Sequence, residues 1–259
     1  MRHVLAVGVV LAVAVSTSAA FADVTVKGLT TGKGLGQLAE GETTTYIKGL
    51  RMRSDQMRGD EQMTTIIDVD GQKMISINHK KKEAEIINMA DLSETLKKIS
   101  ESDIKASLTP TGQSRTIAGI SCDEHQISIA VDAAPTPELK MTMVMSGPAC
   151  LAKTAPGRET YSAFYRAAVE RGLFFGDPRQ AKAQPGQAKG MSTLYEKLAA
   201  AGVPLSQDIQ IRFEGSGPMA AMMSKMGATS MSFTVSTISA APVDESVFAI
   251  PAGYKTKSR

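Results

Sequence analysis

The chain carries few of the residue types that catalytic and metal sites require. Beyond the N-terminal segment it has two histidines, His79 and His125. A zinc site needs several nitrogen or sulfur ligands at characteristic spacing, and a catalytic triad needs a histidine beside an activated nucleophile. The hydrolase motif G-x-S-x-G is broken at its last position in Gly119-Ile-Ser121-Cys-Asp123. This inventory predicts a non-enzymatic protein with no metal and no cofactor.

Methionine is the one unusual feature of the composition, with 15 residues in the chain and no tryptophan. One group alternates along a predicted strand, and a second has helical spacing at Met219, Met222, Met223 and Met226. Thioethers bind Cu(I), flexible methionines suit variable apolar ligands, and the same spacing is typical of a buried helical face. The pattern therefore leaves three interpretations: ordinary core, a groove for an apolar ligand, or a copper site.

The two cysteines, Cys122 and Cys150, lie at the edges of neighbouring strand-like segments. An even number of cysteines without a C-x-x-C motif indicates a structural disulfide if the chain is exported, which its N-terminal segment predicts. Its loop of about 29 residues is expected to stabilise the fold by about 3.5 kcal/mol on the chain-entropy model.

The N-terminal segment has the pattern of a secretory signal peptide. Arg2 and His3 precede an apolar stretch from Val4 to Val15, and Ala20-Phe21-Ala22 forms an A-x-A cleavage site. The apolar stretch is shorter than the roughly 20 residues that cross a bilayer. We expect residues 1–22 to be removed, which predicts a periplasmic or secreted protein that is not an integral membrane protein.

Charge and length limit the partners and the domain organisation. The chain has 29 Lys and Arg against 26 Asp and Glu. Such a balance gives no reason to expect a nucleic-acid partner. Residues 23–259 contain no repeat and no central linker, so they predict one domain.

A meander of antiparallel strands is predicted in the first half of the chain. Asp70-Gly71 lies between two β-rich segments and predicts a tight hairpin turn with positive φ at both residues. Three lysines, Lys80 to Lys82, form the next corner. The expected strands are Tyr46–Met57, Met63–Asp70, Lys73–His79 and Glu83–Met89.

Three helices are predicted. The first follows Asp91, which with Glu94 resembles a capping box. The second covers about 159–172. The third covers about 193–201 and is expected to begin at Thr193, with Glu196 completing the cap. Residues 177–190 are rich in Pro, Gln, Lys, Ala and Gly without an apolar period, so they predict a mobile loop.

The remaining segments alternate apolar and polar residues, as half-buried strands do. They are expected at 104–108, 114–117, 124–131 and 139–145, followed by two closing strands around Ile211 and Phe233. Strands with one apolar face, together with few helices, favour an antiparallel sheet over a parallel one. We therefore predict an α+β fold: a strongly curved antiparallel sheet, or half-barrel, with about three helices packed on its concave side.

One face of this sheet is the candidate binding surface for a lipid or acyl chain. Its members share inward-facing positions on three strands: Ile127, Ile129, Met141, Met143, Met145, Ile209 and Ile211. A ligand in this groove would be held mainly by burial of apolar surface. The alternative is a structural or protein-interaction role in the cell envelope, in which the same residues fill a core.

Several motifs together resemble the DUF4412 family of exported bacterial proteins. Three of the similar segments are Tyr46-Ile-Lys-Gly-Leu-Arg-Met-Arg-Ser54, Thr65-Ile-Ile-Asp-Val-Asp-Gly-Gln-Lys-Met74 and Ile117-Ala-Gly-Ile-Ser-Cys122. The fourth is the ending, Pro242-Val-Asp-Glu-Ser-Val-Phe-Ala-Ile-Pro-Ala-Gly-Tyr-Lys255. The resemblance implies a half-barrel like that of the lipoprotein carrier LolA and the lipoprotein receptor LolB. It implies no enzymatic activity, and it gives no ligand-binding residues. The absence of Trp and the 177–190 segment depart from the family pattern.

Overall fold

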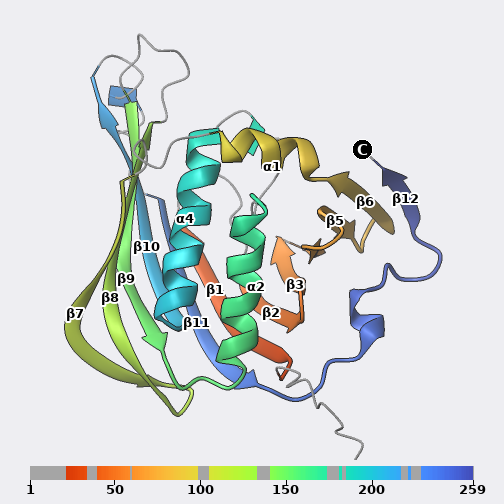
Figure 1. The fold of residues 1–259 in the computed structure, drawn as a ribbon, viewed down its shortest axis with the longest axis horizontal. Helices are drawn as coiled ribbons and strands as arrows, with labels where there is room; N and C mark the ends of the chain where they lie inside the picture. Colours follow the sequence, from red (N-terminus) through yellow and green to blue (C-terminus); the bar gives the residue numbers. More distant parts are fainter. Residues whose placement is uncertain are drawn as a thin grey trace, which may run out of the picture.

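A computed structural model describes residues 22–33, 40–58, 60–98, 105–132, 141–173, 181–182, 185–216, 221–222 and 229–258. The described residues form one 12-stranded sheet, which curves around three helices (Figure 1). The predicted signal peptide lies outside the described residues, apart from Ala22. No helix in the described ranges is long and apolar enough to cross a membrane.

The elements follow one another in two groups of strands separated by helices. The strands are β1 (Val24–Lys33), β2 (Gly41–Lys48), β3 (Arg51–Arg58), β4 (Glu61–Asp68), β5 (Lys73–Asn78), β6 (Glu83–Asn88), β7 (Lys105–Ile117), β8 (Ile120–Asp132), β9 (Met141–Ala152), β10 (Val203–Gly215), β11 (Thr229–Ser239) and β12 (Lys255–Ser258). The helices are α1 (Ala90–Lys97), α2 (Arg158–Glu170), α4 (Pro185–Ala201) and the short 3₁₀ helix η2 (Glu245–Phe248).

The strand order is β12-β6-β5-β4-β3-β2-β1-β11-β10-β9-β8-β7. Each of the two groups is a meander, and the two meet where β1 pairs with β11, with Thr25 opposite Ser239. Neighbouring strands are antiparallel except β12, which runs parallel to β6. Helices α1, α2 and α4 occupy the concave side (Figure 1). This arrangement confirms the predicted α+β half-barrel.

The hairpin predicted at Asp70-Gly71 is present, but its turn is of another kind. Residues 69–72 separate β4 from β5, and the positive φ falls on Gln72 (45°) rather than on Asp70 and Gly71. The Gly71 amide donates a hydrogen bond to Oδ1 of Asp68 at 2.9 Å. A side chain that accepts a bond from the turn backbone stabilises a longer turn than the two-residue turn that we predicted.

Two predicted strand boundaries are wrong. The strand expected over 46–57 is divided at Gly49, whose φ of 55° reverses the chain between β2 and β3. The alternation of apolar and polar residues continues across this turn, so the sequence pattern gave no sign that the strand ends there. Conversely, the short strands expected at 104–108 and 114–117 are one strand, β7, with an irregularity in its pairing between Pro110 and Ser114. A bulge lets a strand continue past a proline and a glycine.

Helix α1 forms where expected, with Leu92 and Leu96 buried. The capping box at Asp91 is wrong, because the helix begins at Ala90 and its N-cap, Met89, makes no side-chain capping bond. Oδ1 of Asn88 instead accepts a hydrogen bond from the Ala90 amide at 2.9 Å. The residue before the N-cap therefore satisfies one free amide of the first turn.

Helix α4 is twice as long as the sequence suggested, because it begins at Pro185. Of the predicted mobile loop, residues 185–190 are helical, while 177–180 and 183–184 lie outside the described residues. Proline is well tolerated in a first turn, where its missing amide proton has no partner to lose. Thr193 is not a cap: its hydroxyl donates to the Lys189 carbonyl at 3.1 Å within the helix. The buried side of the first turns is made of Ala188 and Gly190, small residues that give no apolar period.

The buried apolar side chains form three clusters. The largest, which we call the main core, joins α1 and α2 to β1–β3 and includes Phe164 and Ile47. The second, the α4 cluster, joins α4 to β8, β9 and β10. The third lies on the other face of β4–β6, under the C-terminal segment 240–258, and includes Ile77 and Phe248. The C-terminal segment is thus a cover for the convex side of the first meander.

Candidate functional site

Strands β8, β9 and β10 position the predicted groove residues. Side chains alternate between the faces of a strand, so one residue in two points to the concave side. Five of the seven predicted residues belong to the α4 cluster and are at most 7% exposed: Ile127, Ile129, Met143, Met145 and Ile209. Ile211 packs at the margin of the cluster, and Met141 is half-buried at the first residue of β9.

Helix α4 covers this apolar face. Leu194 and Leu198, 3% and 1% exposed, belong to the same cluster, and Met191 packs against it. Phe213 and Leu108 extend the apolar face beyond these contacts and are only partly buried. The α4 leucines therefore occupy the position that a ligand would take, which the sequence did not reveal.

The opposite side of α4 is joined to α2 by hydrogen bonds and aromatic contacts. The Ser162 hydroxyl donates to the Ala199 carbonyl at 2.6 Å, and the Ser192 hydroxyl donates to the Leu173 carbonyl at 3.2 Å. The rings of Tyr165 and Tyr195 are stacked with their centroids 5.6 Å apart. These contacts join α4 to α2, whereas α4 meets the sheet through apolar side chains.

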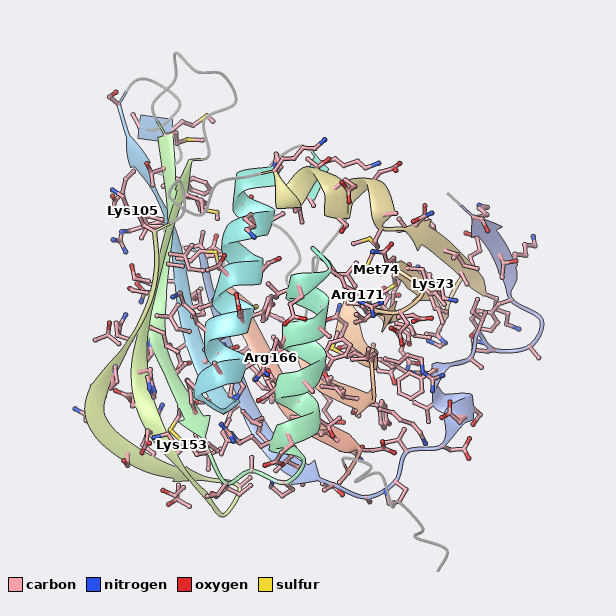
Figure 2. All side chains as sticks on the ribbon, in the orientation of Figure 1. Lys73, Met74, Lys105, Lys153, Arg166 and Arg171 are labelled. Atoms are coloured by element: carbon pink, nitrogen blue, oxygen red, sulfur yellow. A yellow bond between two sulfur atoms is a disulfide. The ribbon has the colours of Figure 1, made fainter. Side chains whose placement is uncertain are left out.

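Helix α2 is in turn fixed to the first meander through its C-terminal end. Arg171 donates a hydrogen bond to the Val69 carbonyl at 3.1 Å and forms an ion pair with Asp70 at 2.8 Å. In the view of Figure 2, Arg171 is labelled in the same region as Lys73 and Met74 of β5. The hydroxyl of Ser93 in α1 donates to the Arg171 carbonyl. Helices α1 and α2 and the first meander are thus connected by polar contacts as well as by the main core.

Three tyrosines lie together between α2 and α4. Burial raises the pKa of Tyr161, Tyr165 and Tyr195 above the ordinary tyrosine value, so their hydroxyls stay protonated at neutral pH. The Tyr165 hydroxyl donates to the Met52 sulfur at 3.7 Å. These groups are neutral donors in an apolar environment, which suits helix packing rather than proton transfer.

A polar chain on the convex side is the nearest approach to a catalytic constellation. The Thr64 hydroxyl donates to Oδ1 of Asp55 at 2.5 Å and lies 2.8 Å from Nε2 of His79. Nδ1 of His79 is 3.0 Å from the Tyr254 hydroxyl, and Arg53 holds Asp55 through Nε. Thr64 is 0% exposed, so no substrate reaches its hydroxyl. No pattern in the sequence pointed to this polar chain, because its members are common residues on separate strands.

This polar chain should stabilise the fold. Thr64→Val keeps the side-chain shape but leaves Asp55 and His79 each without one partner, so we expect the free energy of unfolding to fall by about 1–3 kcal/mol. Urea denaturation of the variant measures this loss. Thr65→Val, on the other face of the same strand, is the matched control and should change stability little. Equal effects of the two substitutions would show that the polar chain contributes nothing.

The disulfide prediction is confirmed. Cys122 and Cys150 are bonded, with Cα atoms 5.3 Å apart, close to Lys153 in Figure 2. In the described ranges no group of three or more His, Cys, Asp or Glu could hold a metal ion. Of the helically spaced methionines, Met222 is 55% exposed, and Met219, Met223 and Met226 lie outside the described residues.

Comparison with known proteins finds one family model and several solved structures that are similar to this chain. The similar structures include an uncharacterised conserved protein from Thermus thermophilus (8% identity, TM-score 0.38, covering 92% of this chain and 91% of that one) and the Mycobacterium tuberculosis lipoprotein LppX (13% identity, TM-score 0.38, covering 86% and 89%). No curated protein matches the sequence. The model of a family described as a domain of unknown function, DUF4412, matches residues 35–162. The matched residues contain β2–β9 and the start of α2, and the match confirms the resemblance that the sequence motifs indicated.

Proposed function

We propose that this protein binds an apolar ligand, a lipid or an acyl chain, between α4 and strands β8–β10, and that it does so outside the cytoplasm. The observation that carries the proposal is the apolar concave face of these strands. Its side chains form a cluster separate from the main core, and α4 covers them. The Cys122–Cys150 disulfide supports an oxidising compartment, because disulfides persist there and are rare in the cytosol.

The two sides of α4 make contacts of different kinds, and this difference indicates where a ligand would enter. Hydrogen bonds and small residues join α4 to α2, and apolar side chains join it to the sheet. An acyl chain can replace the contacts of Leu194 and Leu198 with contacts of the same chemical kind, at about 25 cal/mol per Å² of buried surface. In this mechanism α4 stays with α2 and separates from β8–β10. The flexible side chains of Met143 and Met145 adapt to the shape of the ligand.

The absence of tryptophan allows a direct test. Phe213→Trp places one fluorophore at the margin of the α4 cluster, and Phe248→Trp places one in the cluster under the C-terminal segment. We expect brominated stearate, which quenches tryptophan on contact, to quench the first variant at least twofold more strongly than the second, by our rough estimate for a site that buries most of the chain. Steady-state fluorescence titration measures the difference.

The remaining outcomes separate the alternatives. Equal quenching at both positions would indicate nonspecific adsorption of the fatty acid and would reject the proposed cleft. No quenching at either position, in variants whose disulfide and thermal transition are intact, would favour a structural or protein-interaction role in the envelope. Binding of Cu(I) that Met143→Leu removes without unfolding would support the copper interpretation.

A further inference from the structure

The convex face of β8–β11 has a hollow of about 290 Å³ that the proposed lipid site does not use. It lies on the other side of the sheet from the α4 cluster, because Ile209 points inward and its neighbours along β10 point outward. Polar side chains of four adjacent strands converge on it: Gln126, Ser146, Asp208, Gln210, Ser230 and Ser232. These residues lie opposite one another on neighbouring strands. Asp208 is paired with Ser232, and Gln210 is paired with both Ser146 and Ser230.

A glycine lines the hollow. Gly147 has a φ of 156°, and a Cβ at this residue would lie 1.8 Å from the carbonyl oxygen of Asp208. Only glycine therefore allows β9 to approach β10 so closely. The next residue, Pro148, also lines the hollow and has no amide proton to donate to a neighbouring strand. Regular pairing of β9 with β10 resumes on either side, at Gln207–Ala149 and Gln210–Ser146.

The lining excludes three classes of ligand. It is too polar for an acyl chain. An anion would meet the carboxylate of Asp208, and the neighbouring cation, Arg212, is already engaged, because it donates to Oε1 of Glu214 at 2.8 Å and to the Ser146 hydroxyl at 3.1 Å. A calcium ion takes six to eight oxygen ligands, usually several of them carboxylates, and the described residues around this hollow supply one carboxylate.

What remains is a neutral ligand with many hydroxyl groups. Serine hydroxyls and glutamine amides both donate and accept hydrogen bonds, and a carboxylate accepts from two adjacent hydroxyls at once. Pro148, which lines the hollow, has an apolar ring that can contact the C–H groups of a sugar. The volume is near the lower limit of small-molecule sites, which corresponds to one or two sugar rings. We infer that this hollow binds a neutral saccharide, with Asp208, Gln210 and Ser232 as its principal hydrogen-bonding groups.

The test uses the folded chain and defined sugars. Two-dimensional NMR of the ¹⁵N-labelled protein is followed during titration with maltose and, separately, with glucuronate, which adds a negative charge. We expect maltose to shift the amide resonances of β9–β11 around the hollow. A maltose concentration of about 10 mM is needed, because an open polar site binds weakly. Glucuronate should bind more weakly because Asp208 repels it. Absence of maltose shifts, or stronger binding of glucuronate, would overturn the inference.

Matched variants locate the site. Ser232→Phe fills the hollow, and Ser236→Phe adds the same side chain at an exposed position of β11 outside it. We expect the first to abolish the maltose shifts and the second to retain them. Asp208→Asn keeps the shape, removes the charge and should weaken maltose binding about tenfold, because hydrogen bonds to charged groups are the stronger ones. Unchanged maltose binding in Asp208→Asn, or in a folded Ser232→Phe, would contradict the assignment. Because the apolar cleft lies on the other face, brominated stearate quenching should be unaffected.

Discussion

Replacing Phe164 with alanine is expected to lower the free energy of unfolding by about 3–5 kcal/mol, the range observed when a fully buried phenylalanine is truncated. Phe164 is 0% exposed and belongs to the main core, where its ring meets that of Tyr165 edge-on at 5.3 Å. Helix α2, which carries it, packs on β1, β2 and β10. The loss of stability combines the lost transfer free energy of the buried ring with the cost of the cavity that remains between helix and sheet.

Urea denaturation followed by circular dichroism measures the Phe164→Ala effect. Phe213→Ala is the control, because it removes the same atoms from a partly buried position at the margin of the α4 cluster. It should cost less than half as much. A Phe164→Ala variant no less stable than Phe213→Ala would contradict the role of Phe164 in packing α2 on the sheet.

Removal of the disulfide is expected to have an effect of similar size. Cys122 and Cys150 are 28 residues apart, and closure of such a loop in the unfolded chain is worth about 3.5 kcal/mol on the chain-entropy model. Both cysteines are buried, at 2% and 0% exposure. The double variant Cys122→Ala/Cys150→Ala should therefore unfold at a lower urea concentration than the oxidised wild type.

A reducing agent supplies the control for the disulfide. It should lower the stability of the wild type to nearly that of the double variant, and it should leave the double variant unchanged. If the reduced and oxidised wild-type proteins unfold at the same urea concentration, the bridge does not stabilise the fold. A further decrease of the variant in reductant would point to an effect unrelated to this bond.

Local sequence patterns predicted which segments form strands better than they predicted where each strand begins and ends. The alternation of Met143 and Met145, like that of Ile209 and Ile211, correctly gave one face of each strand, because side-chain direction depends only on position along a strand. Gly49 broke a predicted strand without interrupting the apolar pattern. The positive φ lies at Gln72, and not at the predicted residues, because a four-residue loop has more than one position where φ can be positive.

Long-range packing could not be predicted from the sequence. The first turns of α4 bury Ala188, Gly190 and Ser192, and small residues make a close helix contact without an apolar stripe. The apolar face of the candidate site was visible in the sequence, but its cover by Leu194 and Leu198 depends on where α4 lies in space. Similarly, Asp55, Thr64, His79 and Tyr254 meet only because β3, β4 and the C-terminal segment are adjacent.

The pairing of β1 with β11 sets the order in which the chain can fold. A polypeptide that emerges with its N-terminus first presents β1 at once, yet one edge of β1 stays unpaired until β11 has emerged some 200 residues later, a separation typical of slow-folding topologies. The last residues then complete the first meander, where the Val243 amide donates to Oδ2 of Asp23 at 2.8 Å. An emerging chain therefore carries an open strand edge for most of its length. Such an edge invites aggregation, so a holding chaperone would aid this protein until β11 is available.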